Sequence, residues 1–366
     1  MAHVATITID HTKVPGDLTD YVGLIVPDGS AGYSALYALC LEGGGDIRLF
    51  KSDDTTELAR EIVSFSVSAE TGEIHYKYSG TLSSSVDTDI HVYADGSSSD
   101  YATTATYGRN AVWTDYAGVW HMQASSGSFV DSTGNGNSAT NTGTLPNQVA
   151  GKIGKAQDYN GTSDKSIVAG DSTFDFSSGY TLSFWANADS FGNSSSSPST
   201  AIGSGFVSNK YQFMIGNWSD WGPNNWGGGF YDGKWRTVSL DSFPATSTWF
   251  QTHMTYDNSS LKFFVDGANE DTLSYTGTIS TDNPDIGFGC FLQGNGGRLF
   301  DSRLEEIRIK ITADTANWIT TEYNNQNAES TFWGTWTDVS TATTVTNIIS
   351  IGNIVELNNI SSIIGA

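Results

Sequence analysis

Aromatic rings and amide groups are concentrated in one segment, GNWSDWGPNNWGGGFYDGKW, at residues 216–235. Flat aromatic rings can stack on pyranose rings, and a few oriented Asn and Asp side chains can fix the hydroxyls. Glycines interrupt the segment, which predicts a long loop or a loosely paired hairpin. Tryptophans exposed there would form a contact surface, whereas the alternative is that they pack beneath the loop. The candidate binding residues are Trp218, Trp221, Asn224, Asn225, Trp226, Tyr231 and Trp235.

Carboxylates arranged for hydrolysis are missing from the sequence. A retaining glycosidase needs two carboxylates about 5–5.5 Å apart, which Glu-x-Asp-x-Glu on one strand supplies, and that pattern does not occur. Glu305 and Glu306 are adjacent, so a strand would place them on opposite faces. No Gly-x-Ser-x-Gly elbow or His-x-x-x-His pair occurs, and His121 and His253 are expected to be packed within strands. We therefore predict no catalytic residues, although carboxylates from different strands could still meet.

Oxygen-rich side chains suit calcium, which takes six to eight oxygen ligands. No EF-hand spacing occurs, and the alternative is that these residues form Asx-turns. The candidate calcium ligands are Asp131, Asn160, Asp164, Asp301 and Glu305. The two cysteines, Cys40 and Cys290, have no CxxC spacing, which argues against a zinc site. We predict two free buried thiols rather than a disulfide.

The elements that must position these residues are predicted to be strands. The chain has 366 residues with 40 glycines and abundant Ser, Thr and Asp, and it lacks long runs at helical spacing. This composition favours an all-β fold. Alternating apolar residues predict strands at 4–9, 21–26, 46–50, 61–67, 73–78, 88–93, 180–189, 285–291 and 298–310.

The overall charge is strongly negative, at −23. Nucleic-acid binding is therefore not expected, because phosphate contacts need clustered Lys and Arg. The first residues lack the basic and apolar regions of a secretory signal, and no apolar run reaches the length of a membrane span. We expect no membrane insertion.

Residues 249–267, WFQTHMTYDNSSLKFFVDG, predict two strands joined by a polar turn and followed by an Asp-Gly turn. This sequence pattern resembles the central hairpin of laminin-G-like, concanavalin A-like lectin domains. Further blocks in the family's order extend the resemblance over about residues 111–336. It implies a jelly-roll sandwich that binds a glycan on a host surface. Ser302 and Glu305 depart from the Gly and Asp that related modules carry, which puts an inherited metal site there in doubt.

The first part of the chain resembles a different family. HTKVPGDLTDYVGLIV, GGDIRLFKSDDTTELAREI and TDIHVYADG resemble blocks of a bacterial and phage domain family of unknown function, over about residues 3–96. We therefore predict an N-terminal β-sandwich-like domain at 1–96, a linker at 97–110 and the lectin-like sandwich at 111–338. The resemblance implies a fold and a neighbouring lectin-like module, and no activity.

A short β-structured tail, residues 339–366, carries a different pattern. Branched residues recur every third position, which an α-helix would not gather on one face. One chain supplies too few repeats to bury a core, so we predict a homotrimeric stem or anchor. The alternatives are an ordinary pair of strands that finishes the sandwich and a segment that becomes ordered on a partner. The predicted assembly residues are Ile348, Ile351, Ile354, Leu357, Ile360 and Ile363.

These features favour a non-enzymatic adhesive protein of a phage virion, as a tail fibre, tail-tip component or capsid decoration. Its expected partners are itself, other virion proteins and a host-surface glycan. The alternatives are a bacterial cell-surface or secreted carbohydrate-binding protein and a polysaccharide hydrolase.

Overall fold

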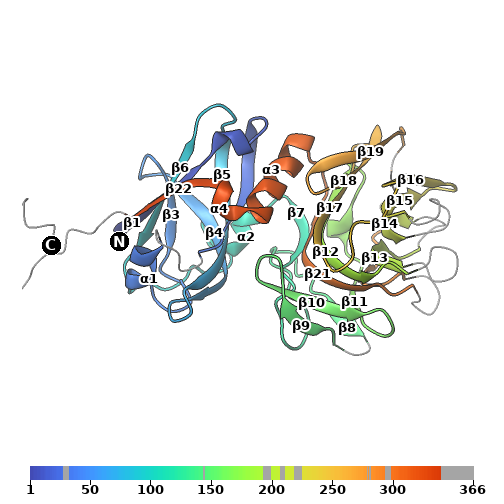
Figure 1. Cartoon of the computed structure of the whole chain (residues 1–366), viewed down its shortest axis with the longest axis horizontal. Helices are drawn as coiled ribbons and strands as arrows, with labels where there is room; N and C mark the ends of the chain where they lie inside the picture. The colour runs from blue at the N-terminus through green and yellow to red at the C-terminus, as the bar shows by residue number, and fades with distance from the viewer. Residues whose placement is uncertain are drawn as a thin grey trace, which may run out of the picture.

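The computed structural model describes residues 1–27, 33–142, 145–192, 199–206, 211–217, 225–277, 279, 282–292 and 298–338. The predicted all-β class is confirmed, since nearly half of the chain lies in strands and helices are few and short. The described residues form two lobes (Figure 1). The predicted tail and its six assembly residues lie outside the described part of the chain.

One curled antiparallel sheet forms the N-terminal lobe. Its seven strands lie in the spatial order β2 (Leu18–Ile25), β5 (Thr71–Leu82), β4 (Glu57–Ser66), β3 (Arg48–Lys51), β6 (Thr88–Ala94), β1 (Ala2–Ile9) and β22 (Trp333–Asp338). The short helices η1 (His11–Lys13) and α1 (Ser34–Leu39) belong to the same lobe. The alternating apolar residues of β1, such as Ile7 and Ile9, are fully buried in its core.

Two further sheets pack face to face in the second lobe. The first has the order β19 (Ala268–Ser274), β18 (Ser260–Val265), β17 (Trp249–Tyr256), β12 (Tyr180–Ser190), β21 (Asp301–Lys310), β10 (Lys155–Asn160) and β9 (Asn147–Ala150), and β7 (Tyr116–Trp120) also pairs with β21. The second has the order β16 (Trp235–Ser239), β15 (Gly227–Tyr231), β14 (Tyr211–Asn217), β13 (Ser199–Ser204), β20 (Ile286–Phe288), β11 (Lys165–Val168) and β8 (Thr140–Thr142). The predicted hairpin at 249–267 is confirmed by the pairing of β17 with β18.

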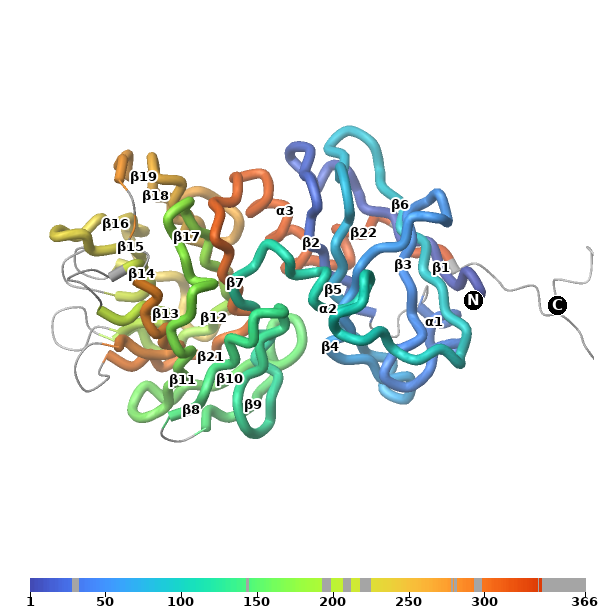
Figure 2. Tube along the Cα trace, turned by 180° about the vertical axis from the view of Figure 1, so that it is seen from behind, coloured from blue at the N-terminus to red at the C-terminus, as the bar shows by residue number. Residues whose placement is uncertain are grey.

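The chain passes between the lobes twice. It enters the sandwich through α2 (Arg109–Val112) and β7, and it returns through α3 (Ala316–Asn327), α4 (Glu329–Phe332) and β22. Both views show α3 between the lobes, and the view from behind shows α2 and β7 there as well (Figures 1 and 2). β22 pairs with β1 of the N-terminal sheet. The assignment of residues 333–338 to the sandwich was therefore wrong.

Polar side chains of α3 join the lobes directly. Asn325 accepts a hydrogen bond from the Leu24 N–H at 2.7 Å and donates one to the Leu24 carbonyl at 2.9 Å, so it occupies the free edge of β2. Gln326 on the same helix accepts hydrogen bonds from Trp185 and Gln251 of the sandwich. A small apolar core with Val22 on one side and Trp113 on the other lies beside this helix.

Residues 97–110, predicted as a linker, lie against the N-terminal lobe. Arg60 donates a hydrogen bond to the Asp100 carboxylate at 2.8 Å, and Tyr101 donates one to Glu57 at 2.7 Å. The Ser-, Thr- and Ala-rich composition predicted a linker because the contacts with the lobe come from only a few side chains, such as Asp100 and Tyr101. Cys40 and Cys290 are free and buried, as predicted. Within the described residues, no helix combines the length and the apolar character that membrane crossing requires.

Candidate functional site

Trp226 belongs to the sandwich core and not to a surface. Its side chain is 0% exposed, and its ring lies 5.6 Å from that of Phe250 and 5.3 Å from that of Phe300. Its indole N–H donates to the Thr252 hydroxyl at 3.1 Å. A ring without exposed surface cannot stack on a sugar, so the prediction that Trp226 binds a ligand was wrong, and the packing alternative holds at this position.

Tyr231 and Trp235 lie together on the face of the second sheet that points away from the core. Phe230 is buried in the core, so the alternation of the strand turns Tyr231 outward. Trp235 is its partner across the β15–β16 ladder, and the two rings meet edge to face with centroids 5.4 Å apart. Both side chains are half-buried, and they pack on the buried side chains of Met214 and Phe291. We call these four side chains the outward face.

Charged and polar residues neighbour the two rings in the sequence, and Arg236 is the register partner of the buried Phe230, so it points to the opposite face of the sheet. Asp232 follows Tyr231 directly, accepts hydrogen bonds from Tyr275 and Arg236, and forms an ion pair with Arg236. Burial opposes ionisation of Asp232, but the bond from Tyr275 and the charge of Arg236 lower its pKa overall. Asn225 donates to the Ser239 hydroxyl at 3.5 Å. Three candidate residues, Trp218, Trp221 and Asn224, lie outside the described residues.

The predicted calcium ligands do not form one group. Asp131 is buried and accepts hydrogen bonds from the backbone of Val119, Thr133 and Asn137, as expected of an Asx-type turn. Glu305 is also buried, and its carboxylate accepts N–H groups of the 152–154 turn. Burial raises the pKa of Glu305 to about 8. These two residues lie apart from the other three.

Asn160, Asp164 and Asp301 are neighbours at one edge of the sandwich. Asn160 pairs with Asp301 across β10 and β21, and its backbone N–H donates to Asp164. The Asn160 amide oxygen also accepts the N–H groups of residues 162–164, which is the Asx-turn alternative. Calcium binding at this edge stays a prediction.

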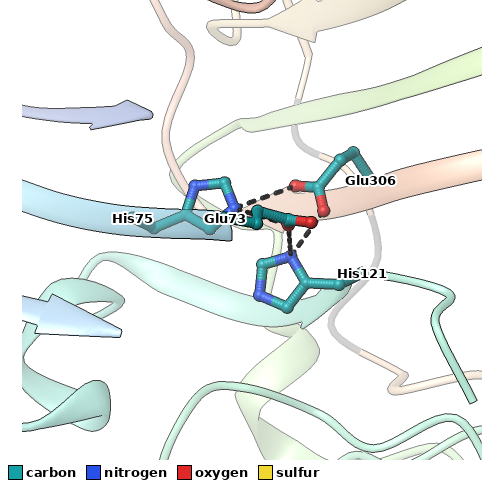
Figure 3. A group of neighbouring side chains, drawn as sticks. All are labelled: Glu73, His75, His121 and Glu306. Carbon is teal, nitrogen blue, oxygen red and sulfur yellow. Dashed lines mark hydrogen bonds and ion pairs between the residues drawn. The ribbon is translucent and has the colours of Figure 1, made fainter. Parts of the chain in front are cut away.

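A second group of polar side chains lies between the lobes, and its residues are not among the candidates predicted from the sequence. Glu73 and His75 come from β5, Glu306 comes from β21, and His121 follows β7 (Figure 3). We call these four residues the Glu–His cluster; each is at most 6% exposed. One nitrogen or oxygen atom from each lies within 4.8 Å of the others. The two imidazole rings are stacked with centroids 4.7 Å apart.

The backbone places these side chains in specific ways. Glu73 and His75 are two residues apart on a strand and therefore share a face. Glu306 has a φ of +50° beside a register shift between β12 and β21, so a bulge turns its side chain. Met122, directly after His121, has a φ of +59°. Positive φ in a buried residue other than Gly, Asn or Asp is uncommon and is associated with functional sites.

Further buried groups surround the Glu–His cluster. Glu61 faces His75 across the β4–β5 ladder and lies 3.1 Å from His121 Nε2. Glu61 itself accepts hydrogen bonds from the Trp113 indole at 2.5 Å and the Ser132 hydroxyl at 2.7 Å. Arg308 donates to Glu306 at 2.7 Å and to Glu322 at 3.3 Å.

These neighbours set the protonation of the cluster. Burial disfavours an imidazolium at His121, but the carboxylates of Glu306 and Glu61 outweigh it and raise the pKa of His121 well above its ordinary value. Burial and the charge of Glu306 raise the pKa of Glu73. Burial lowers the pKa of His75 to about 3, so this ring is neutral at neutral pH.

The sequence contained one signal for this cluster, the Glu-x-His spacing on a predicted strand. Residues 73–78 were predicted to be a strand, and His121 was expected to be an ordinary packed residue. The cluster draws on three strand regions that lie up to 233 residues apart, as the contact between His75 and Arg308 illustrates. Only the pairing of the two lobes brings them together.

Comparison with known proteins identifies part of the second lobe. Residues 160–320 match the model of the family described as the concanavalin A-like lectin/glucanases superfamily. No curated protein matches the sequence. Among solved structures, domain 4 of AbnA, a GH43 extracellular arabinanase from Geobacillus stearothermophilus in complex with arabinotriose, is 19% identical with a TM-score of 0.47, covering 56% of this chain and 97% of that chain.

Two toxin structures are similar to the same extent. The binding domain of Paraclostridial Mosquitocidal Protein 1 is 18% identical with a TM-score of 0.46, covering 60% of this chain and 55% of that one. The receptor-binding domain of botulinum neurotoxin mosaic serotype C/D is 15% identical with a TM-score of 0.45, covering 58% and 51%. The chain thus spans about half of each toxin chain. Residues 160–320 form a domain of the concanavalin A-like lectin/glucanase superfamily, as the family match and the two packed sheets agree.

Proposed function

We propose that this protein is a non-catalytic carbohydrate-binding protein and that the outward face holds the sugar. The observation that carries the proposal is the pair of half-buried rings, Tyr231 and Trp235, side by side on the outer surface of a concanavalin A-like domain. A tryptophan ring offers a flat apolar surface to a pyranose, and a tyrosine adds a hydroxyl. Met214 and Phe291 support both rings from below.

The charged neighbours of the rings lie on the other face of the hairpin. Arg236 is the register partner of the buried Phe230, so its side chain and the Asp232 carboxylate paired with it lie opposite the two rings. Sites for small ligands combine apolar walls with a few polar groups, and here Tyr231 brings a hydroxyl to the ring pair. A neutral sugar chain with one pyranose ring on Trp235 is the ligand that this arrangement favours.

A non-catalytic role is favoured by the positions of Glu305 and Glu306, the adjacent acids of β21. Glu305 accepts N–H groups from one turn, whereas Glu306 faces His121 between the lobes. Neither carboxylate lies on the outward face. Release of reducing ends from polysaccharides that the protein binds would contradict this part of the proposal.

We further place this binding function on a virus particle, with attachment to a host-surface glycan. The resemblance of residues 3–96 to a bacterial and phage domain family supports this, as does the repeat pattern of residues 341–366. Light scattering of the full-length chain should then give the mass of a trimer. A monomer in solution would contradict self-assembly and favour a bacterial cell-surface or secreted protein.

A glycan panel tests the binding proposal. Immobilised neutral and acidic oligosaccharides are incubated with the wild-type chain, Trp235→Ala, Tyr231→Ala and the control Tyr101→Ala, which removes a half-buried ring from the other lobe. We expect at least one glycan to bind, with about 10-fold or greater weakening in the first two variants, because truncating an aromatic residue at the centre of a binding site costs about 2 kcal/mol or more. Equal binding by Trp235→Ala and wild type would refute the assignment.

A further inference from the structure

We propose that Glu73, His75, His121 and Glu306 bind a divalent transition-metal ion, with zinc as the best fit, and that this ion joins the two lobes. The site is independent of the proposed sugar binding, since its residues lie between the lobes and not on the outward face. Two ligands come from the N-terminal sheet and two from the sandwich. An ion held by all four would therefore connect the halves of the molecule.

The distances between the candidate ligand atoms fit a tetrahedral ion. His75 Nε2 lies 3.1 Å from Glu73 Oε1 and 3.8 Å from Glu306 Oε2. His121 Nδ1 lies 3.7 Å from the same Glu73 oxygen and 2.5 Å from the other oxygen of Glu306, Oε1. Zinc bonds of about 2.0–2.1 Å place tetrahedral ligand atoms about 3.3 Å apart, and the observed distances lie on both sides of this value, so Glu306 would offer either oxygen to the ion.

Outer groups hold the ligands in the orientation that a metal requires. Zinc-binding histidines usually donate their second N–H to a carboxylate, and Glu61 lies at that position beside His121 Nε2. Gln123 donates to Glu73, and Arg308 donates to Glu306. One contact would have to change: Arg308 Nη2 lies 3.5 Å from His75 Nδ1, which carries the ring proton when Nε2 binds a metal, so the two donors would move apart.

The charges of the surroundings favour a cation. The carboxylates of Glu61, Glu73, Glu306 and Glu322 are all buried here, and Arg308 is the permanent cation in contact with two of them. Buried carboxylates are costly unless they are paired, protonated or bound to a metal. His121 supplies a positive charge here when its ring is protonated, and a divalent ion that displaced this proton would place a larger charge at the point where Glu73 and Glu306 approach each other.

The bulge at Glu306 and the positive φ after His121 are also explained by a bound ion. Strained backbone persists where the surrounding structure holds it, and metal bonds would do so here. A pocket of about 340 Å³ reaches the edge of the site, lined by Glu61, Arg109, His121, Gln123 and Ser132 among others. This pocket provides a path by which an ion could enter.

The ligand types select the kind of metal. Imidazole nitrogen suits zinc and other transition metals, whereas magnesium and calcium prefer oxygen ligands throughout. Two smaller groups, His3 with Asp54 and His91, and His11 with Asp10 and Asp87, lie at the surface of the N-terminal lobe. Each offers three partly exposed ligands, so these groups provide matched controls.

The test uses the full-length chain after removal of metals with a chelator. Calorimetric titration with zinc chloride, and metal analysis after dialysis, should give one tightly bound zinc per chain and a higher melting temperature. Titration with cobalt(II) should give the visible absorption of a tetrahedral site. A chain that binds no zinc, or whose melting temperature does not change with zinc, would overturn the proposal.

Variants then locate the ion. Glu73→Gln and His121→Gln should weaken zinc binding at least 100-fold, and Glu61→Gln should weaken it about 10- to 100-fold, as expected for an outer partner. His91→Gln and His11→Gln should bind zinc as wild type does. Near-ultraviolet circular dichroism shows which variants are folded, and Glu61→Gln keeps all four ligands should a ligand variant fail to fold. Loss of zinc in His91→Gln or His11→Gln alone would overturn the assignment. Glycan binding by the wild-type chain is scored separately.

Discussion

The outward face and the Glu–His cluster differ in how the fold builds them. The outward face has both of its half-exposed rings on two neighbouring strands, β15 and β16, four residues apart in the chain. The Glu–His cluster is buried, and its four residues come from regions of both lobes. The two rings pack on Met214 and Phe291 and keep part of their surface exposed, whereas each member of the cluster is buried and held by buried partners.

Because of this difference, mutations at the two places should have different effects, one mainly on ligand binding and the other mainly on stability. The two rings of the outward face should matter for ligands and little for folding, because partly exposed side chains away from the core have small effects on stability. Residues in and around the cluster should matter for the packing of the two lobes and for the free energy of unfolding, because a buried charge that loses its partner is costly.

The largest effect is expected for Arg308→Met. Methionine retains the apolar stem but leaves Glu306 and Glu322 without their shared guanidinium. Removing one partner of a buried ion pair costs about 3–5 kcal/mol of the free energy of unfolding. Denaturant unfolding measures the loss, with Arg236→Met, which breaks a partly exposed pair, as the control. Equal stability of the two variants would contradict the expected difference in stability.

Trp226→Ala should cost a similar amount, about 3–5 kcal/mol, because it removes a fully buried ring and leaves a cavity. Trp235→Ala should change the free energy of unfolding by less than about 1 kcal/mol, since its ring is half-buried. The same denaturant experiment compares the two tryptophans. A larger loss for Trp235→Ala would move this ring from the outward face into the packing of the sandwich.

Acid should destabilise the protein through Glu322, which lies on α3 between the lobes (Figure 1). Burial opposes ionisation of Glu322, but Arg308 and His253 outweigh it and lower the pKa of Glu322 to about 2 in the folded protein. A carboxylate whose pKa is lowered by folding contributes stability above its unfolded value of 4.5, and this is lost as the pH falls toward 2. The loss should be about 2–3 kcal/mol and smaller in Glu322→Gln, as thermal melts across this pH range would reveal. An identical pH dependence in both proteins would contradict the assignment.

Asn325→Ala should have a smaller effect, about 1–3 kcal/mol, because it leaves the Leu24 N–H and carbonyl without partners. Asn324→Ala removes a single hydrogen bond to Lys13 and is the matched control. Hydrogen exchange at Leu24 should increase in the first variant and stay unchanged in the second. Unchanged exchange in both would show that α3 does not protect the edge of β2.

Local patterns predicted the strands, and they could not predict contacts between lobes. Alternation correctly located β12 and the β17–β18 hairpin, because alternate residues of these strands enter the core between the two sheets. The same reasoning could not separate Trp226 from Trp235, since the parity of a short strand beside glycines is ambiguous. It also missed the return of β22 to the N-terminal sheet, because that pairing joins residues more than 320 positions apart.

For the Glu–His cluster, the sequence offered Glu73 and His75 on one strand face but no sign of their partners. His121 and Glu306 meet them only through the bulge at Glu306 and the docking of the lobes, neither of which has a sequence motif. Searching for His-x-x-x-His or CxxC detects sites built on one element. A site assembled from three strand regions has no such spacing.

A crystal structure of the protein with the tightest-binding glycan of the panel would show whether the outward face binds carbohydrate. We expect a pyranose ring stacked on Trp235, with Tyr231 beside it. An ordered glycan bound elsewhere on the sandwich, with Trp235 uncovered, would contradict this expectation.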